Sequence, residues 1–232
     1  YNRPIETPVA NLRPAKETCE ECHWPSHFYS QKLKDRTYYL SDEENTRVEM
    51  SMLMKIGGVE HGKSEGIHAH MYLDHEITYV ATDRQRQAIP YVEAKGPDGK
   101  VRVYRNKEIK FTDADLKKGE RRVVDCIDCH NRPSHQYKHP EMTLNKAMAS
   151  GLVDVRIPEI KSVAVEALEK EYKTEKEALT GIKKHIEDYY KENHAEKMAG
   201  LQKELASSIK HVQEVYQQNY FPEMKVSWKA FP

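Results

Sequence analysis

The chain has 232 residues, of which 38% are hydrophobic and 32% are charged, so its apolar content is low for its size. Its 37 basic and 37 acidic residues cancel, and this balance argues against a nucleic acid partner. No segment approaches the roughly 20 apolar residues of a membrane span, and the polar, proline-containing start does not resemble a signal peptide. We expect one large domain or two small ones, in a chain processed or truncated from a longer protein.

The first half of the chain changes from an extended segment to strand-like sequence. Residues 1–18 contain three prolines and predict an extended lead-in. From Thr46 to about Phe111, alternating and β-branched residues predict an antiparallel sheet of three to five strands, with a Gly-Pro-Asp-Gly-Lys turn at 96–100. Pro90 predicts that its strand lies at an edge of the sheet or breaks there.

The last part of the chain has helical periodicity. Residues 131–151 allow a short helix at most, because two prolines and a glycine bracket them. A first amphipathic helix is expected to begin near Pro158, and a second begins at Thr174, which forms a Thr-x-x-Glu capping box with Glu177. A third is expected at about 195–220.

These elements predict an α+β fold, in which a small antiparallel β-sheet is inserted between two cysteine motifs and is followed by a C-terminal bundle of about three amphipathic helices. We expect residues 1–150 to form one domain that contains the two motifs and the β insertion at about 46–111. Residues 151–232 are then a helical region that packs on this domain or against a partner.

The four cysteines of the chain all lie in two copies of one pattern, Cys-x-x-Cys-His. This pattern is the attachment signature of c-type haem. Cysteines at i and i+3 lie one helical turn apart and reach the two vinyl groups of the porphyrin, while the adjacent His ligates the iron. The pattern therefore predicts two covalently attached haems c. The attachment residues are Cys19, Cys22, Cys126 and Cys129, and the proximal ligands are His23 and His130.

A structural zinc site and a pair of redox disulfides are the alternative interpretations of the cysteines. Neither requires a His after each pair. Histidine is 12 of 232 residues, so chance would place it after both pairs roughly once in 400 chains. The two pairs are also separated by more residues than zinc ribbons allow, which favours haem. Haem also offers a large apolar surface that would compensate for the low apolar content.

The remaining histidines are candidates for the second axial ligand of each iron. His68 and His70 lie two residues apart, so on a strand they would face the same side, where one could ligate and the other pack nearby. His135 follows His130 too closely to reach the same iron easily. We therefore expect His135 on the first haem and His68 on the second, although the strand pair also fits two ordinary surface histidines. The alternating row Met50, Met52 and Met54 is more typical of a core than of ligands.

Haem propionates are anionic and need basic partners. The candidates are Arg84 and Arg86, which lie in the predicted sheet region, and Arg132, which follows the second motif. Surface arginines are common, so an ordinary solvated position is the alternative for each.

Five segments, RPAKETCEECHWP, GIHAH, YVATDRQRQAIPYV, DCIDCHNRPSHQY and YFPEMKVSW, together resemble the soluble region of large NapC/NirT-type multihaem cytochromes of anaerobic bacteria. In that family, a membrane-anchored cytochrome takes electrons from quinol and passes them through several haems to periplasmic acceptors. Small members carry a membrane helix and four or more haem motifs, and this chain carries neither. The resemblance therefore implies relay of electrons in a soluble dihaem region rather than quinol oxidation by this chain.

We expect an electron carrier with low-potential bis-His haems that relays single electrons between redox proteins in anaerobic respiration. Its partners would be other multihaem cytochromes or a quinol-oxidising membrane module, and oligomerisation is left open. The family implies a periplasmic or extracellular location, with an anchor in the parent protein. The alternatives are a haem enzyme that reduces a small oxyanion or peroxide, with His70 or Arg84 at the substrate, and a haem-based redox or ligand sensor.

Overall fold

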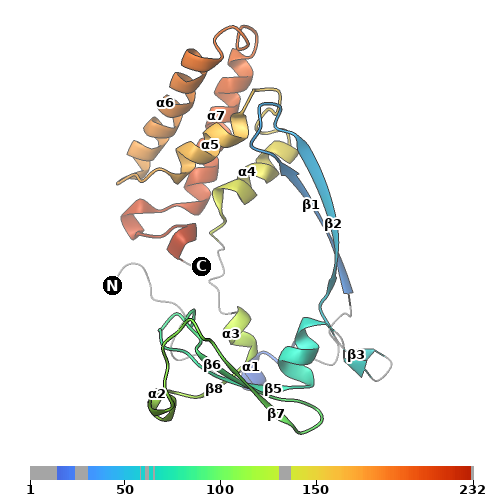
Figure 1. Ribbon diagram of the computed structural model, residues 1–232. Coiled ribbons are helices and arrows are strands. Elements are labelled where there is room, and N and C mark those ends of the chain that lie inside the picture. The colour runs from blue at the N-terminus through green and yellow to red at the C-terminus, as the bar shows by residue number, and fades with distance from the viewer. Residues whose placement is uncertain are drawn as a thin grey trace. The chain divides into compact units, whose positions relative to one another are not determined.

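The structure is a computed structural model that describes residues 15–23, 31–57, 59–60, 63–64, 66–130 and 137–230 (Figure 1). Contacts within the chain define two compact units. The helical unit consists of Tyr1–Ile5, Asp35–Ser51 and Pro133–Pro232, and the sheet unit consists of Glu6–Lys34 and Met52–Arg132. Strands β1 (Gln31–Tyr39) and β2 (Arg47–Lys55) pair in a two-stranded sheet, and each contributes residues to both units.

The sheet unit is built around four antiparallel strands in the order β7-β6-β5-β8. Their bounds are β5 (Glu76–Val80), β6 (Tyr91–Lys95), β7 (Val101–Arg105) and β8 (Arg122–Val123). The predicted turn between β6 and β7 is confirmed, since Gly96 N donates to Lys100 O at 3.1 Å and Gly99 has a φ of 72°. Pro90 immediately precedes β6, which agrees with the predicted break.

Shorter elements complete the sheet unit. They are α1 (Ala15–Thr18), β3 (Val59–Glu60), β4 (Lys63–Ser64), η2 (Ala69–Leu73), α2 (Asp113–Lys118) and α3 (Cys126–His130). The sequence pattern did not predict α2, although Thr112 and Asp115 form a complete capping box at its start. It also did not predict η2, a turn of π-helix in a segment interpreted as a strand.

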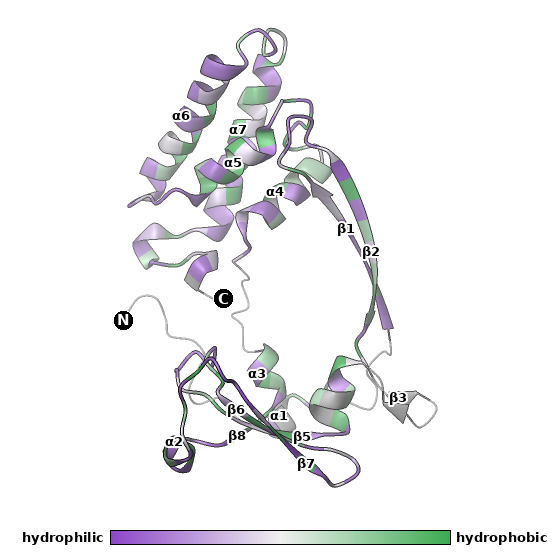
Figure 2. Cartoon of the chain, viewed as in Figure 1, coloured by the Kyte–Doolittle hydropathy of each residue, from purple (hydrophilic) through white to green (hydrophobic). Residues whose placement is uncertain are grey.

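Four helices form the body of the helical unit: α4 (Pro140–Ala149), α5 (Ile160–Glu169), α6 (Glu175–Asn193) and α7 (Gln202–Asn219). Short 3-10 turns η3 (Pro222–Met224) and η4 (Trp228–Ala230) follow. Hydrophilic residues predominate along α6, while hydrophobic residues are interspersed along α5 and α7 (Figure 2). The helical unit begins before residue 151, because α4 packs against α5 and α7.

The three predicted C-terminal helices are present, but their starts differ from the predictions. Helix α7 begins at Gln202, about seven residues after the predicted start at 195. Helix α5 begins two residues after Pro158, because Glu159 adopts a left-handed backbone with a φ of 56°. The Thr174 side chain accepts from Glu177 N at 3.2 Å, as the capping box requires, but the Glu177 carboxylate accepts from Lys173 N instead of Thr174 N. Helix α4 is longer than the short helix that its prolines suggested.

The hydrophobic core of the described chain lies in the helical unit. Its fully buried members come from all four helices and include Leu144, Ile160, Leu168, Ile182, Ile186 and Val212. In the described part of the sheet unit, by contrast, the buried hydrophobic residues are Ala69, Tyr79, Val80 and Tyr91. The sheet unit therefore has little protein core of its own, and a bound apolar group would supply what it lacks.

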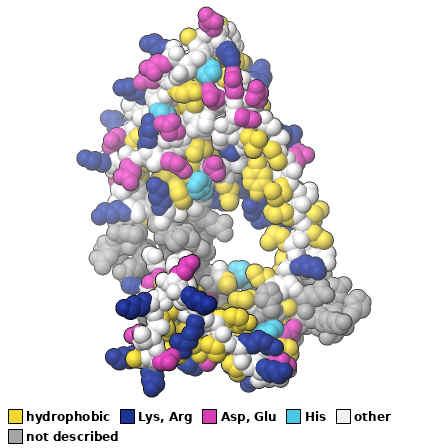
Figure 3. Space-filling model, in the orientation of Figure 1, with side chains coloured by type: hydrophobic (Ala, Val, Ile, Leu, Met, Phe, Trp, Pro, Cys, Tyr) yellow, Lys and Arg dark blue, Asp and Glu magenta, His cyan; other side chains and the backbone are white. Residues whose placement is uncertain are grey.

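The methionine row of β2 differs from its expected place in a core. Met50 and Met54 are 42% and 44% exposed, and the neighbouring Leu53 is 61% exposed. Hydrophobic side chains accordingly gather along the β1–β2 edge of the space-filling view (Figure 3). Among the described residues, no helix combines the length and the apolar character needed to cross a membrane.

Candidate haem-binding site

The second cysteine motif forms a short helix, as its spacing requires. All five of its residues make up α3, so Cys126 and Cys129 lie one turn apart and His130 follows at the next position. Neither cysteine is in a disulfide. Cys129 and His130 are exposed, while Cys126 is partly buried. This local geometry presents two thiols and an imidazole on one short helix.

The first motif is a turn that follows α1. His23 N donates to Cys19 O at 2.7 Å, and Cys22 N donates to the same carbonyl at 3.3 Å. Cys19 is partly buried, whereas Cys22 and His23 are exposed. As in the second motif, one turn of backbone brings the two thiols and the imidazole close together in sequence and space.

The two motifs lie near each other within the sheet unit. Burial is the main reason that the pKa of the Cys126 thiol is raised to about 11, followed by the negative charge of Asp125. Glu20 and Cys19 of the first motif also raise it. Residues more than a hundred positions earlier thus act electrostatically on Cys126, so two groups attached at these motifs would be neighbours.

The rings of His68 and His130 lie close together and are nearly parallel. Their centroids are 6.4 Å apart and their planes differ by 13°. An imidazole centroid lies roughly 1.1 Å from its ring nitrogen, and a metal–imidazole bond is about 2.0 Å long, so two imidazoles on opposite sides of one metal have centroids about 6.2 Å apart. Direct ring stacking brings the planes closer than this. The spacing therefore fits two axial ligands of one iron.

The hydrogen bonds of His68 favour the same role. Its Nδ1 lies 2.9 Å from Ile56 O, and because a carbonyl can only accept, Nδ1 carries the proton. The other nitrogen, Nε2, is then the unprotonated atom that a metal requires. The backbone N of His68 also donates to Ile56 O at 3.1 Å. Such a carbonyl partner orients the ring, as it commonly does for metal-bound histidines.

The backbone around His68 is helical, which corrects the strand interpretation of this segment. His68 is the N-terminal cap of η2, and His70 belongs to the same turn. The alternation that placed the two histidines on one side of a strand therefore does not apply. The side chain of His70 lies outside the described part of the chain, and so do His135 and Arg132, which fall within residues 131–136.

The arginines of the predicted sheet have different surroundings. Arg86, which has a φ of 57°, donates from Nη1 to Asp128 Oδ1 at 2.8 Å, so its guanidinium pairs with a residue inside the second motif. Arg84 is exposed in the same loop. Sequence reasoning missed Arg122 and Tyr79, which also bind Asp128. The one feature of the sequence that could have indicated them is Asp128, the acidic residue between the two cysteines. A carboxylate that is shielded from solvent needs hydrogen-bonding partners within the protein.

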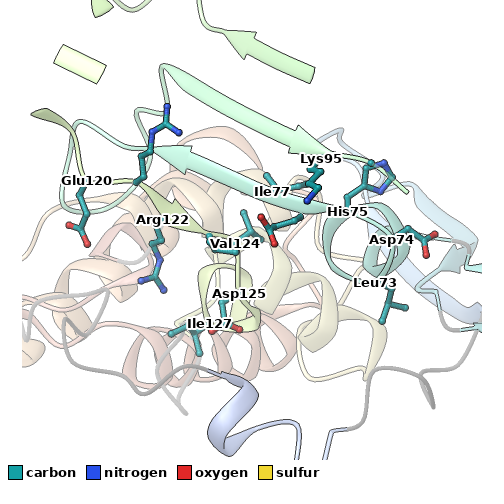
Figure 4. Close-up of a pocket in the computed structure, with 14 residues that line it drawn as sticks. Leu73, Asp74, His75, Ile77, Lys95, Glu120, Arg122, Val124, Asp125 and Ile127 are labelled. Carbon is teal, nitrogen blue, oxygen red and sulfur yellow. The ribbon is translucent and has the colours of Figure 1, made fainter. Parts of the chain in front are cut away.

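A pocket of about 730 Å³ in the sheet unit lies beside the start of the second motif (Figure 4). Val124 and Asp125 line it from the segment that leads into α3, Ile127 lines it from α3 itself, and His75 lines it from the segment between η2 and β5. Its lining also includes Leu73, Ile77, Lys95, Arg121 and Arg122. Acidic side chains line it as well, namely Asp74, Glu76, Glu120 and Asp125, so the pocket is of mixed charge and does not by itself indicate a haem.

A structural zinc site is the competing metal interpretation of the cysteines. All four cysteines are described, and among the described residues no three His, Cys, Asp or Glu side chains cluster as metal ligands. A structural zinc site would need four such ligands around one point. The motifs instead present separate Cys-x-x-Cys-His turns, as haem attachment requires.

Comparison with known proteins gives one informative relationship. No family model matches the chain, and no solved structure matches it. The chain is homologous to a c-type cytochrome. The relative is the cytochrome c-type protein ImcH of Geobacter sulfurreducens, which is 42% identical over 233 aligned residues. The alignment covers all of this chain and 46% of the relative, so the chain spans about half the length of the curated relative that it matches.

Proposed function

We propose that this chain is a dihaem region of a larger NapC/NirT-type multihaem c-type cytochrome, and that it relays single electrons between redox proteins in anaerobic respiration. Homology to a c-type cytochrome over the whole chain supports the covalent attachment of haem. The presence of two complete Cys-x-x-Cys-His motifs supports a count of two. A longer parent protein is consistent with a relative of about twice this length.

The main structural observation behind the proposal is the arrangement of His68 and His130. The first haem is held by Cys19, Cys22 and His23, and the second by Cys126, Cys129 and His130. His68 is then the distal ligand of the second haem, supported by the 6.4 Å centroid distance and by the Nδ1 hydrogen bond to Ile56 O. His135 remains the proposed distal ligand of the first haem, and His70 remains its neighbour or alternative.

Two histidines on one iron favour electron transfer over substrate chemistry. A haem supplies a one-electron couple, and imidazoles on both faces leave the metal without an open position. Bis-His ligation also gives a lower potential than His-Met ligation. Both motifs belong to the sheet unit, which supports two haems within one compact unit, as a relay needs.

The propionates, the partners and the location complete the proposal. Arg84 and Arg132 are proposed propionate partners. Arg86 pairs with Asp128, so it would affect the second haem through Asp128 rather than through a propionate. The partners are redox proteins, either other multihaem cytochromes or a quinol-oxidising membrane module. Because attachment of haem c is completed outside the bacterial cytoplasmic membrane, the proposed location is the periplasmic or extracellular face, with an anchor in the parent protein.

The test combines intact mass with spectroscopy on the holoprotein and its variants. The wild-type protein should carry two haems and show low-spin c-type bands. His68→Ala should keep both haems but convert about half of the low-spin signal to high spin, because one of the two irons loses a ligand. His211→Ala, which removes a helical-unit histidine bonded to Glu214, should leave the spectrum unchanged.

Three results would count against the proposal. A His68→Ala spectrum identical to that of the wild type would exclude His68 as a ligand, and His70→Ala would then show whether the neighbouring histidine takes the role. A high-spin signal in the wild-type protein would favour an open iron and therefore a haem enzyme. Wild-type protein without covalent haem would refute the proposal as a whole.

A further inference from the structure

The two motifs differ at the residue before the second cysteine. In the second motif this residue is Asp128, whose side chain is only 9% exposed. Its Oδ1 accepts from Tyr79 Oη at 2.9 Å, Arg86 Nη1 at 2.8 Å and Arg122 Nε at 2.7 Å, and its Oδ2 accepts from Asp125 N at 2.8 Å. One carboxylate inside the attachment helix thus holds four donors.

The donors come from separate parts of the sheet unit. Tyr79 belongs to β5 and Arg122 to β8, while Arg86 lies in the loop between β5 and β6. Charge-assisted hydrogen bonds of this kind are stronger than neutral ones, and two of these donors are guanidiniums. Asp128 therefore ties α3 to two adjacent strands and to a loop, and it limits how far the helix can rotate or shift on the sheet.

Asp128 also affects two of its donors electrostatically. Burial, followed by the hydrogen bond to Asp128, raises the pKa of Tyr79 to about 12. Burial alone would lower the pKa of Arg122, but the hydrogen bond and the negative charge of Asp128 outweigh it and raise that pKa.

The first motif has a different environment at the equivalent position. There the residue before the second cysteine is Glu21, which is exposed. Solvent screens an exposed carboxylate, whereas a buried carboxylate and its partners act in a lower effective dielectric. The two motifs therefore share their ligand chemistry but differ in what surrounds them.

We propose that Asp128 is a positioning residue that fixes the second attachment helix so that the ring of His130 faces His68, and that its charge cluster gives the second haem a redox environment unlike that of the first. This proposal rests on the proposed dihaem function. The role is specific to the second motif, because the matching side chain of the first motif has no comparable burial. Removal of a buried partner from such a cluster leaves the opposite charges uncompensated.

The test is a potentiometric titration with electron paramagnetic resonance on the holoprotein. In Asp128→Asn a negative charge is lost while both guanidiniums remain, so reduction becomes easier and the midpoint potential of one of the two haems should shift upward. In Arg86→Gln a positive charge is lost, so the same haem should shift downward. The matched control is Glu21→Gln in the first motif, which should leave the second haem unchanged.

Tyr79→Phe separates position from charge. It removes one hydrogen bond to Asp128 without altering any charge, so it should broaden or shift the low-spin resonance of one haem with a smaller change of potential. An Asp128→Asn protein that retains the first haem but loads the second poorly, measured by intact mass, would also support the positioning role. If Asp128→Asn does not fold, Arg86→Gln and Tyr79→Phe decide the question.

The inference and the proposed function fail in different ways. Wild-type protein with two low-spin haems, in which Asp128→Asn and Arg86→Gln shift neither potential or shift both haems equally, would overturn the role of Asp128 alone. Potential shifts of the same sign in the two variants would overturn the electrostatic part. Wild-type protein without low-spin haem would instead overturn the proposed function.

Discussion

Replacement of Asn45 tests how the turn between β1 and β2 is held to the start of α5 within the helical unit. Asn45 is 2% exposed and has a left-handed backbone with a φ of 51°. Its Nδ2 donates to Val155 O at 3.0 Å and to Ile157 O at 2.8 Å, and its Oδ1 accepts from Lys161 N at 3.1 Å. One side chain therefore satisfies three backbone groups that precede or begin α5.

The expected cost of Asn45→Ala follows from these contacts. Three hydrogen bonds at about 1 kcal/mol each give a loss of about 3 kcal/mol. A left-handed alanine adds about 1 to 2 kcal/mol of backbone strain, since asparagine tolerates this conformation better. We expect Asn45→Ala to lower the free energy of unfolding by about 4 to 5 kcal/mol, and Asn45→Gly to cost about 1 kcal/mol less, because glycine removes the strain but not the lost bonds.

The assay is urea unfolding of the holoprotein, followed by the far-ultraviolet circular dichroism of the helices. The matched control is Asn193→Ala, which removes a single exposed hydrogen bond from Asn193 Nδ2 to Tyr189 O at the end of α6. It should change the free energy of unfolding by less than about 0.5 kcal/mol. An Asn45→Ala protein within about 1 kcal/mol of the wild type would refute this account of the buried turn.

Two further predictions concern pH and the removal of haem. A hydrogen bond from Tyr189, and to a lesser extent one from His194, lowers the pKa of Glu159 below its ordinary value of 4.5. The stabilisation that these bonds provide is therefore present above pH 4.5 and is lost as the pH falls through the lowered pKa. Urea unfolding at a series of acidic pH values should show this slope, and Glu159→Gln should flatten it; equal slopes would contradict the assignment. Replacement of all four cysteines by serine should leave the helical unit cooperatively folded but reduce the amide protection of the sheet unit in hydrogen exchange, because the latter has few buried apolar residues. Unchanged protection in the sheet unit would show that its fold does not depend on haem.

Local patterns predicted several elements of the structure well. The Gly-Pro-Asp-Gly turn, the three C-terminal helices and the cap by the Thr174 side chain depend on neighbouring residues, and each is present, although α5 and α7 begin later than the sequence predicts. The helical form of α3 also follows from its spacing. These features need no knowledge of distant contacts, since capping and periodicity are read over a few residues.

Other features depend on contacts between distant residues. The segment around His68 contains Ile, Met, Tyr and Leu, a composition that favours a strand, yet it forms a helical turn closed by Ile56 O. Asp128 meets Tyr79 and Arg86, which lie 49 and 42 residues earlier, so no local pattern reveals the cluster. Strand β1 was not predicted and helix α4 was expected to be short, because the pairing of β1 and the packing of α4 outweigh weak local preferences.

The central claim is that a haem attached by thioether bonds occupies each motif. Each haem iron would have one imidazole ligand on either face of the porphyrin. The most direct measurement is spin quantitation by electron paramagnetic resonance of the oxidised holoprotein. The account predicts two low-spin ferric haems per chain, both with the signature of bis-His ligation. A spectrum without haem, or one in which a high-spin iron replaces either low-spin signal, would contradict it.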